Sequence, residues 1–525
     1  MLFRSLAKLP QSETFPLIKK FPQHEESTAQ PIEDYYIRQK PVDVVDHRTA
    51  EEELTDNSFY QMKKKRSAES WPASFFTETS ETAPKSYHEV RKVLRKGKLA
   101  FFKINETNSP MSELETAICQ FYRLFAPDLI PKMHTVYSDK PNGGYEQDVI
   151  GTASKALPGF KSIRDDALTP NDLVIESLTQ KIVTVAELKQ IYRIHKATNA
   201  QPLSNMPDDE LLSFHLPNKT VVLKASDLKH FEIIKSVATI LVLSYLFEED
   251  DLHCGNVSKY GRIDFDMSLW TLLHHFKNNG ILKVISRMVR SPNADQFEIT
   301  EKDILNFPKL TDAIPFYWPI FSEEGKVKNR TRWLASKTAD AFSFAGLPVT
   351  SNNYSEQVSS TYAHLITNEV FEDIKYETFL RFCLMPDAAY HAIAEAEINS
   401  QVRQYNYNTS IVDDITTHLR ERTEQCKKTL CKMPTFRNYV DKNGNMVLSD
   451  FKDDLADRNN KLDARLAKRN AMDPAFERMY PEFIKQKVDL QQLDERFASI
   501  KKTCQTIISN GSRSKGRIQN KTPIF

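Results

Sequence analysis

The sequence predicts an α+β fold, because strand-like patterns come first along the chain and helical patterns follow. Residues 87–104 have the pattern of a hairpin, and residues 129–137 and 145–151 predict two further strands of the same small sheet. Residues 161–250 and 401–508 are mostly helical by pattern. A chain of 525 residues is long enough for two or three domains.

Composition excludes some classes of function. Lys and Arg total 71 against 70 Asp and Glu, so the net charge of +1 provides no overall field that would attract nucleic acid. The most apolar run, residues 237–247, is shorter than the roughly 20 residues of a membrane helix and predicts a buried helix. The first 20 residues lack a secretory signal pattern, which favours a cytoplasmic location. The cysteines lack zinc-site spacing and suit a reducing compartment; they are Cys119, Cys254, Cys383, Cys426, Cys431 and Cys504.

Two acidic motifs form the centre of the predicted active site. In the first, Asp251 can accept a proton from a substrate hydroxyl, and Asn256 can hold a metal ion. In the second, Asp264 can complete a magnesium site on ATP. Residues 257–262 are short enough for a hairpin that returns both motifs to one end. The motifs read Asp251-Leu252-His253-Cys254-Gly255-Asn256 and Ile263-Asp264-Phe265-Asp266.

This pair of motifs resembles the catalytic and metal loops of atypical kinases of the protein and lipid kinase-like superfamily. That group includes aminoglycoside and choline phosphotransferases, phosphoinositide kinases and Legionella-type translocated effector kinases. The resemblance implies a bilobal protein-kinase-like fold with Asp251 as the catalytic base and His253 ordering its loop. It further implies that Asn256 and Asp264 hold magnesium, with Asp266 as a candidate ligand of a second metal ion.

Two features depart from these kinases. Glu249 and Asp250 replace the His-Gly pair that usually precedes the loop in the aminoglycoside phosphotransferases, which are antibiotic kinases. Asp266 stands where protein kinases have Gly. An acidic loop without a catalytic role is therefore the alternative interpretation.

A lysine and a helix upstream complete the predicted ATP site. Lys103 ends the strand-like run Phe-Phe-Lys-Ile and resembles the kinase lysine that contacts the α and β phosphates. The helix predicted over residues 109–125 offers Glu115 as the partner of Lys103, with Glu113 as the alternative. Gly97 is the only glycine between residues 60 and 120, so a glycine-rich phosphate loop is not expected. The segment that contains Ala153 and Ser154 resembles the linker between kinase lobes, which implies that these residues contact adenine.

Clusters of positive charge offer candidate sites for a polyanion, such as an inositol polyphosphate activator or a phosphoinositide. A solvated surface is the alternative for each cluster. A basic tail from Asn510 onwards, expected to be disordered, could contact acidic membranes. The polyanion candidates are Lys63, Lys64, Lys65 and Arg66, and on the predicted hairpin Arg91, Lys92, Arg95, Lys96 and Lys98.

The predicted domains are a partly disordered extension over residues 1–85, a kinase N-lobe over 86–160, a C-lobe over 161–400 and a helical module with a basic tail over 401–525. Within the module, the run Asp441–Asn445 predicts an Asn-Gly turn, and its spacing does not fit a calcium loop. The resemblance to the effector kinases implies ATP- and Mg²⁺-dependent phosphorylation of Ser or Thr in host proteins, by a bacterial kinase that is secreted into the host cell. The alternatives are a phosphoinositide kinase and a pseudokinase-like scaffold that binds phosphoinositides.

Overall fold

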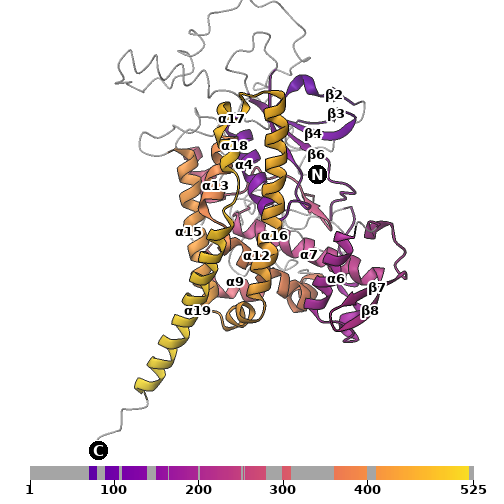
Figure 1. Ribbon diagram of the computed structural model, residues 1–525, viewed down its shortest axis with the longest axis vertical. Coiled ribbons are helices and arrows are strands. Elements are labelled where there is room, and N and C mark those ends of the chain that lie inside the picture. The colour runs from indigo at the N-terminus through magenta and orange to yellow at the C-terminus, as the bar shows by residue number, and fades with distance from the viewer. Residues whose placement is uncertain are drawn as a thin grey trace, which may run out of the picture. The chain divides into compact units, whose positions relative to one another are not determined.

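The computed structural model confirms a mixed α+β fold with a helical C-terminal region (Figure 1). The described residues belong to one compact unit, Phe59–Phe525. The structure describes residues 70–79, 89–105, 109–138, 149–163, 165–198, 201–249, 252, 255–278, 298–308, 360–398 and 410–518.

A six-stranded sheet has the order β1-β5-β6-β4-β3-β2. The predicted hairpin is confirmed, since β3 and β4 pair antiparallel around Lys96 and Gly97, whose positive φ values of 50° and 73° suit a tight two-residue turn. The strand β6 lies between β5 and β4 and pairs antiparallel with both. The strand bounds are Trp71–Pro72 (β1), Thr77–Glu78 (β2), Val90–Arg95 (β3), Lys98–Ile104 (β4), Met133–Tyr137 (β5) and Val149–Lys155 (β6).

The two faces of this sheet have different surroundings. The helix α4, Ser109–Phe125, packs on β5 and β6 and confirms the helix predicted after the hairpin. Its apolar residues, among them Leu114 and Phe121, join the main hydrophobic core. A second, smaller core contains Phe102 and Trp71. Successive side chains of β4 therefore lie on opposite faces of the sheet, as expected for a β-strand.

The apolar run at 237–247 forms the last part of α7, Ala225–Leu246, and its C-cap Phe247. This helix is buried over most of its length and packs against α12, Glu369–Leu384. This confirms a core helix that leads towards the first acidic motif. Among the helices of the described ranges, none combines the length and apolar composition needed to cross a bilayer. Neighbouring elements are η3 (Pro170–Leu173), α5 (Glu176–Thr179), α6 (Val185–Ala197), η4 (Leu203–Asn205), β7 (Leu211–Leu216), β8 (Lys219–Lys224), α8 (Trp270–Asn278), α9 (Glu301–Asn306) and α11 (Ser360–Thr367).

The C-terminal helices share the main core with the preceding helices. Residues of α15, α16 and α19 belong to the same buried cluster as those of α4 and α7, and α15 packs on α12 and α13. Figure 1 shows α15, α16 and α19 as long helices of the last part of the chain. Their bounds are Glu369–Leu384 (α12), Asp387–Glu397 (α13), Ile411–Lys432 (α15), Pro434–Met472 (α16), Phe476–Met479 (α17), Pro481–Lys485 (α18) and Leu490–Ile518 (α19).

Two predictions for this region are wrong. The turn predicted at Asp441–Asn445 lies within the uninterrupted helix α16. Gly444 allows α16 and α19 to pack closely, because a Cβ at this position would lie 2.8 Å from the ring of Phe497 in α19. The tail predicted to be disordered from Asn510 is helix as far as Ile518, since adding residues to an existing helix needs no new nucleus. Its last part, residues 519–525, lies outside the described residues.

Candidate functional site

Lys103 lies in β4, on the face of the sheet that meets α4. Its Nζ lies 3.3 Å from Glu115 Oε1, so the first-choice partner predicted from the sequence makes the ion pair. The alternative, Glu113, is buried on the same helix. Thr152 of β6, which is paired with Lys103 in the sheet, donates a hydrogen bond to the other oxygen of Glu115 at 3.4 Å. Strand and helix together orient the Glu115 carboxylate towards the ammonium.

The second acidic motif reaches the same lysine from a distant part of the chain. Lys103 Nζ lies 3.0 Å from Asp264 Oδ1 and 2.7 Å from Asp266 Oδ2. Burial disfavours charge on Lys103, but the Asp264, Asp266 and Glu115 carboxylates outweigh it and raise its pKa well above the usual value. One ammonium among three carboxylates leaves two negative charges in excess. The cluster of Lys103, Glu115, Asp264 and Asp266, which we call the lysine cluster, would therefore attract a further cation.

A buried arginine holds the backbone of Asp264. Arg262 Nη2 donates to Asp264 O at 2.8 Å, and Nη1 donates to Tyr122 Oη at 2.9 Å and Ser244 Oγ at 2.7 Å. The same guanidinium pairs with Glu249, and both side chains are almost wholly buried. Because Tyr122 lies in α4 and Ser244 in α7, Arg262 ties the second motif to two core helices.

The charge states of this buried pair follow from its surroundings. Burial disfavours charge on Arg262, yet Glu249 outweighs it and raises the pKa of the guanidinium. Burial raises the pKa of Glu249, with Arg262 opposing the shift. The role of neither residue was predicted from the sequence. The one sequence feature that could have indicated this pair was Glu249, a carboxylate at the position where the resemblance implies histidine.

The predicted hairpin between the motifs is confirmed as β9, Val257–Ser258, and β10, Gly261–Arg262. A Cβ at Gly261 would lie 2.7 Å from Leu129 O, so this position needs glycine for close packing. Asn256 is buried, and its carbonyl oxygen accepts from Ile263 N at 2.9 Å. The amide-bearing residue of the first motif thus lies beside the start of the second. Asp251 and His253 lie outside the described residues.

The structure corrects the linker predicted at Ala153 and Ser154, whereas their contact with adenine stays a prediction. Both residues lie inside β6, which continues to Lys155, and each is paired with β4 on one side and β5 on the other. A central strand uses its backbone groups in the sheet, so these residues do not form a free linker edge. The strand β6 thus continues to Lys155, beyond the strand predicted over residues 145–151.

The basic hairpin is less available to a polyanion than its sequence suggests. Arg91 pairs with Glu78 and Glu89 at 2.7 and 2.6 Å. The guanidinium of Arg95 lies 3.7 Å from the ring centroid of Trp71. Lys96 and Lys98 are exposed at the turn, and Lys92 is half-buried. The other candidate cluster, Lys63, Lys64, Lys65 and Arg66, lies outside the described residues.

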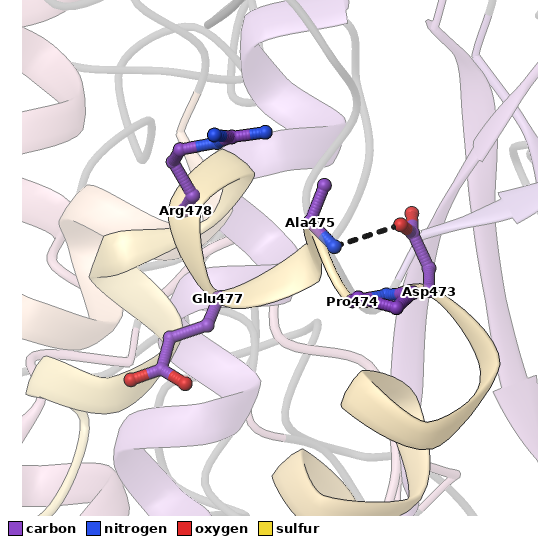
Figure 2. A pocket seen from close by; sticks show the side chains of 5 residues that line it. All are labelled: Asp473, Pro474, Ala475, Glu477 and Arg478. Carbon is purple, nitrogen blue, oxygen red and sulfur yellow. Dashed lines mark hydrogen bonds between the residues drawn. The ribbon is translucent and has the colours of Figure 1, made fainter.

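A shallow surface pocket lies elsewhere in sequence, where α16 ends and α17 begins (Figure 2). Its backbone is held by a hydrogen bond from Ala475 N to Asp473 Oδ1 at 3.0 Å. The side chains of Glu477 and Arg478 point to opposite sides in this view. Its lining residues are Asp473, Pro474, Ala475, Glu477 and Arg478, so it contains none of the predicted site residues.

The predicted magnesium ligands belong to the same part of the structure as the lysine cluster. Across the part of the chain that the structure describes, no group of three or more His, Cys, Asp or Glu side chains is arranged to hold a metal ion. The predicted ligands are the amide of Asn256 and the carboxylates of Asp264 and Asp266, and in this structure both carboxylates pair with Lys103.

The chain matches no protein-family model and no curated protein sequence.

Proposed function

We propose that the protein is an ATP-dependent phosphotransferase with a bilobal kinase-like catalytic domain. The observation that carries the proposal is the lysine cluster, in which Lys103 joins Glu115 of α4 to Asp264 and Asp266 from more than 160 residues later. A lysine paired with a helix carboxylate and placed beside a metal-binding aspartate is the arrangement that protein kinases need before transfer. The strand, helix and acidic loop were all expected at these positions from the sequence.

The chemistry of the cluster suits ATP with magnesium. Mg²⁺ takes oxygen ligands and usually binds through one or two carboxylates together with substrate phosphates. Asp264 is the first ligand in this proposal, with Asn256 beside it and Asp266 for a second ion. Bound Mg²⁺ would neutralise charge on the transferred phosphoryl group. Lys103 would then turn from the aspartates to the phosphates while Glu115 holds its ammonium.

The acceptor is a hydroxyl, and Asp251 is the proposed base that orients it. Our first choice is a Ser or Thr of a host protein, phosphorylated by a bacterial effector, and an inositol lipid is the competitor. The exposed Lys96 and Lys98 on the β3–β4 turn favour a phosphate-rich ligand near this hairpin, as an inositol phosphate activator or a phosphoinositide would require. A scaffold that binds such a ligand without turnover is the third possibility.

Transfer of labelled γ-phosphate from ATP with Mg²⁺ tests the proposal. The acceptors are generic proteins and phosphoinositide vesicles, each with and without inositol phosphates. Asp264→Ala is expected to abolish labelling, whereas Lys468→Met, a change at an exposed lysine of α16, is expected to preserve it. Label on lipid would select the lipid kinase. Absence of label under every condition, together with binding to the vesicles, would select the scaffold.

A further inference from the structure

The C-terminal end of α7 is held by a side chain from far along the chain. Arg422 of α15 donates from Nε to Leu246 O at 2.5 Å and from Nη2 to Tyr245 O at 2.7 Å. The last carbonyl groups of a helix have no partner within the helix, so a guanidinium at this place satisfies two of them. The third nitrogen of Arg422 lies 3.2 Å from Glu248 Oε1, and both side chains are buried.

Glu248 connects this helix end to α15 and to the start of α8. Its Oε2 lies 3.1 Å from His418 Nε2 and accepts from Thr271 N at 3.3 Å. Its carbonyl oxygen accepts from Trp270 N at 3.2 Å. The residue has a φ of +52°, which costs a residue other than glycine on the order of 1 kcal/mol. Such a backbone persists only where the surrounding contacts hold it in place.

The start of α8 directly follows the second acidic motif. Leu269 N donates to Phe247 O at 2.6 Å, so three successive amide groups, at residues 269, 270 and 271, bind the segment that follows α7. Only two residues separate Asp266 from Leu269. A shift of α15 would therefore be transmitted through Glu248 to the aspartates of the lysine cluster.

We propose that Arg422 and Glu248 are positioning residues, through which α15 fixes Asp264 and Asp266 for phosphoryl transfer. The C-terminal helices are then part of the working site and not an appendage to it. The catalytic consequence rests on the proposed function, but the positioning itself does not. Arg422 suits this task better than lysine would, because its planar group donates to two carbonyl groups and pairs with a carboxylate at once.

Hydrogen exchange of the full-length protein tests the positioning without any assumption about catalysis. In Arg422→Met, the amides of residues 269–271 are expected to exchange about tenfold faster than in the wild type. Glu248→Gln, which retains the shape of the side chain, is a second variant in case Arg422→Met does not fold. The matched control is Arg381→Met, which removes a half-buried arginine that pairs with Glu377 and Asp454. Unchanged exchange at 269–271 in a folded Arg422→Met or Glu248→Gln protein would overturn the proposal.

Kinetics test the catalytic consequence. A misplacement of about 1 Å can reduce a rate by about 100-fold, so Arg422→Met is expected to lower kcat by about tenfold or more. The KM for ATP should change by less than about threefold, and Arg422→Lys should recover part of kcat. Full kcat in Arg422→Met, with an inactive Asp264→Ala, would overturn the positioning role. Absence of transfer by the wild type would instead reject the proposed function, and the exchange experiment alone would then decide the positioning.

Discussion

Replacing Lys103 by Met removes the ammonium that three carboxylates share. The side chains of Lys103, Glu115 and Asp266 are 12%, 2% and 11% exposed, whereas Asp264 is 32% exposed. Breaking a buried ion pair by removing one partner costs about 3–5 kcal/mol. Solvent weakens the ion pair between Lys103 and the more exposed Asp264. We therefore expect the free energy of unfolding to fall by about 3 kcal/mol at neutral pH.

The pH dependence of this loss has a definite sign. In the wild type, burial opposes charge on Lys103 but the carboxylates raise its pKa above the ordinary value of 10.5. Its contribution is therefore fully present below pH 10.5 and is lost only as the pH rises through the higher folded-state pKa. In Lys103→Met the carboxylates face one another without the ammonium, and their mutual repulsion destabilises the folded state as long as they are charged. The variant should thus regain stability relative to the wild type as the pH falls from neutral towards about 5.

Urea unfolding of both proteins at neutral pH and near pH 5.5 measures these two effects. Lys98→Met is the matched control, because Lys98 begins the same strand and is exposed. We expect the control to lose less than about 0.5 kcal/mol at either pH. Equal free energies of unfolding for Lys103→Met and Lys98→Met would refute the reasoning, as would a loss that does not depend on pH.

Two further predictions concern parts of the chain outside the lysine cluster. Burial alone would raise the pKa of Glu248, but Arg422 and His418 lower it from 4.5 to about 2, so its contribution is lost as the pH falls from 4.5 to about 2. Thermal unfolding of Glu248→Gln should accordingly depend less on pH in that range than the wild type. Gly444→Ala should lose about 1–3 kcal/mol by urea unfolding, because its Cβ would meet the ring of Phe497. Phe497→Leu should recover part of that loss, and simple additivity would contradict the packing argument.

Local patterns were enough to predict much of the candidate site. The β3–β4 hairpin follows from its turn residues and from strand alternation, and α4 follows from the spacing of its apolar residues. Once strand and helix were placed, the choice of Glu115 over Glu113 depended on which face of α4 is turned to the sheet. The sequence favoured Glu115 but did not fix that rotation, since Glu113 is buried on the same helix; the ion pair with Lys103 decides between them.

The remaining features depend on contacts between distant residues, which local pattern does not encode. Arg422 lies in a helix with many charged residues, where one buried arginine looks like its exposed neighbours. Gly444 follows Asn443, a pair typical of tight turns, but the ring of Phe497 in another helix determines why glycine is needed. The end of β6 was misplaced because its last residues are small and polar and lack the alternation of a half-buried strand.

The backbone at Asp264 bears on whether the lysine cluster serves chemistry or only stability. Asp264 has a φ of +66°, in the left-handed region that glycine adopts freely; Asp tolerates it better than most residues, yet it still costs on the order of 1 kcal/mol. Arg262 maintains it by donating to Asp264 O, and burying that guanidinium with Glu249 is itself costly. If the cluster served only to join α4 to the acidic loop, glycine at 264 with Glu115 and Asp266 on Lys103 would do so with less strain. Retaining a carboxylate here favours a role that needs its charge, and binding a metal ion on ATP is such a role.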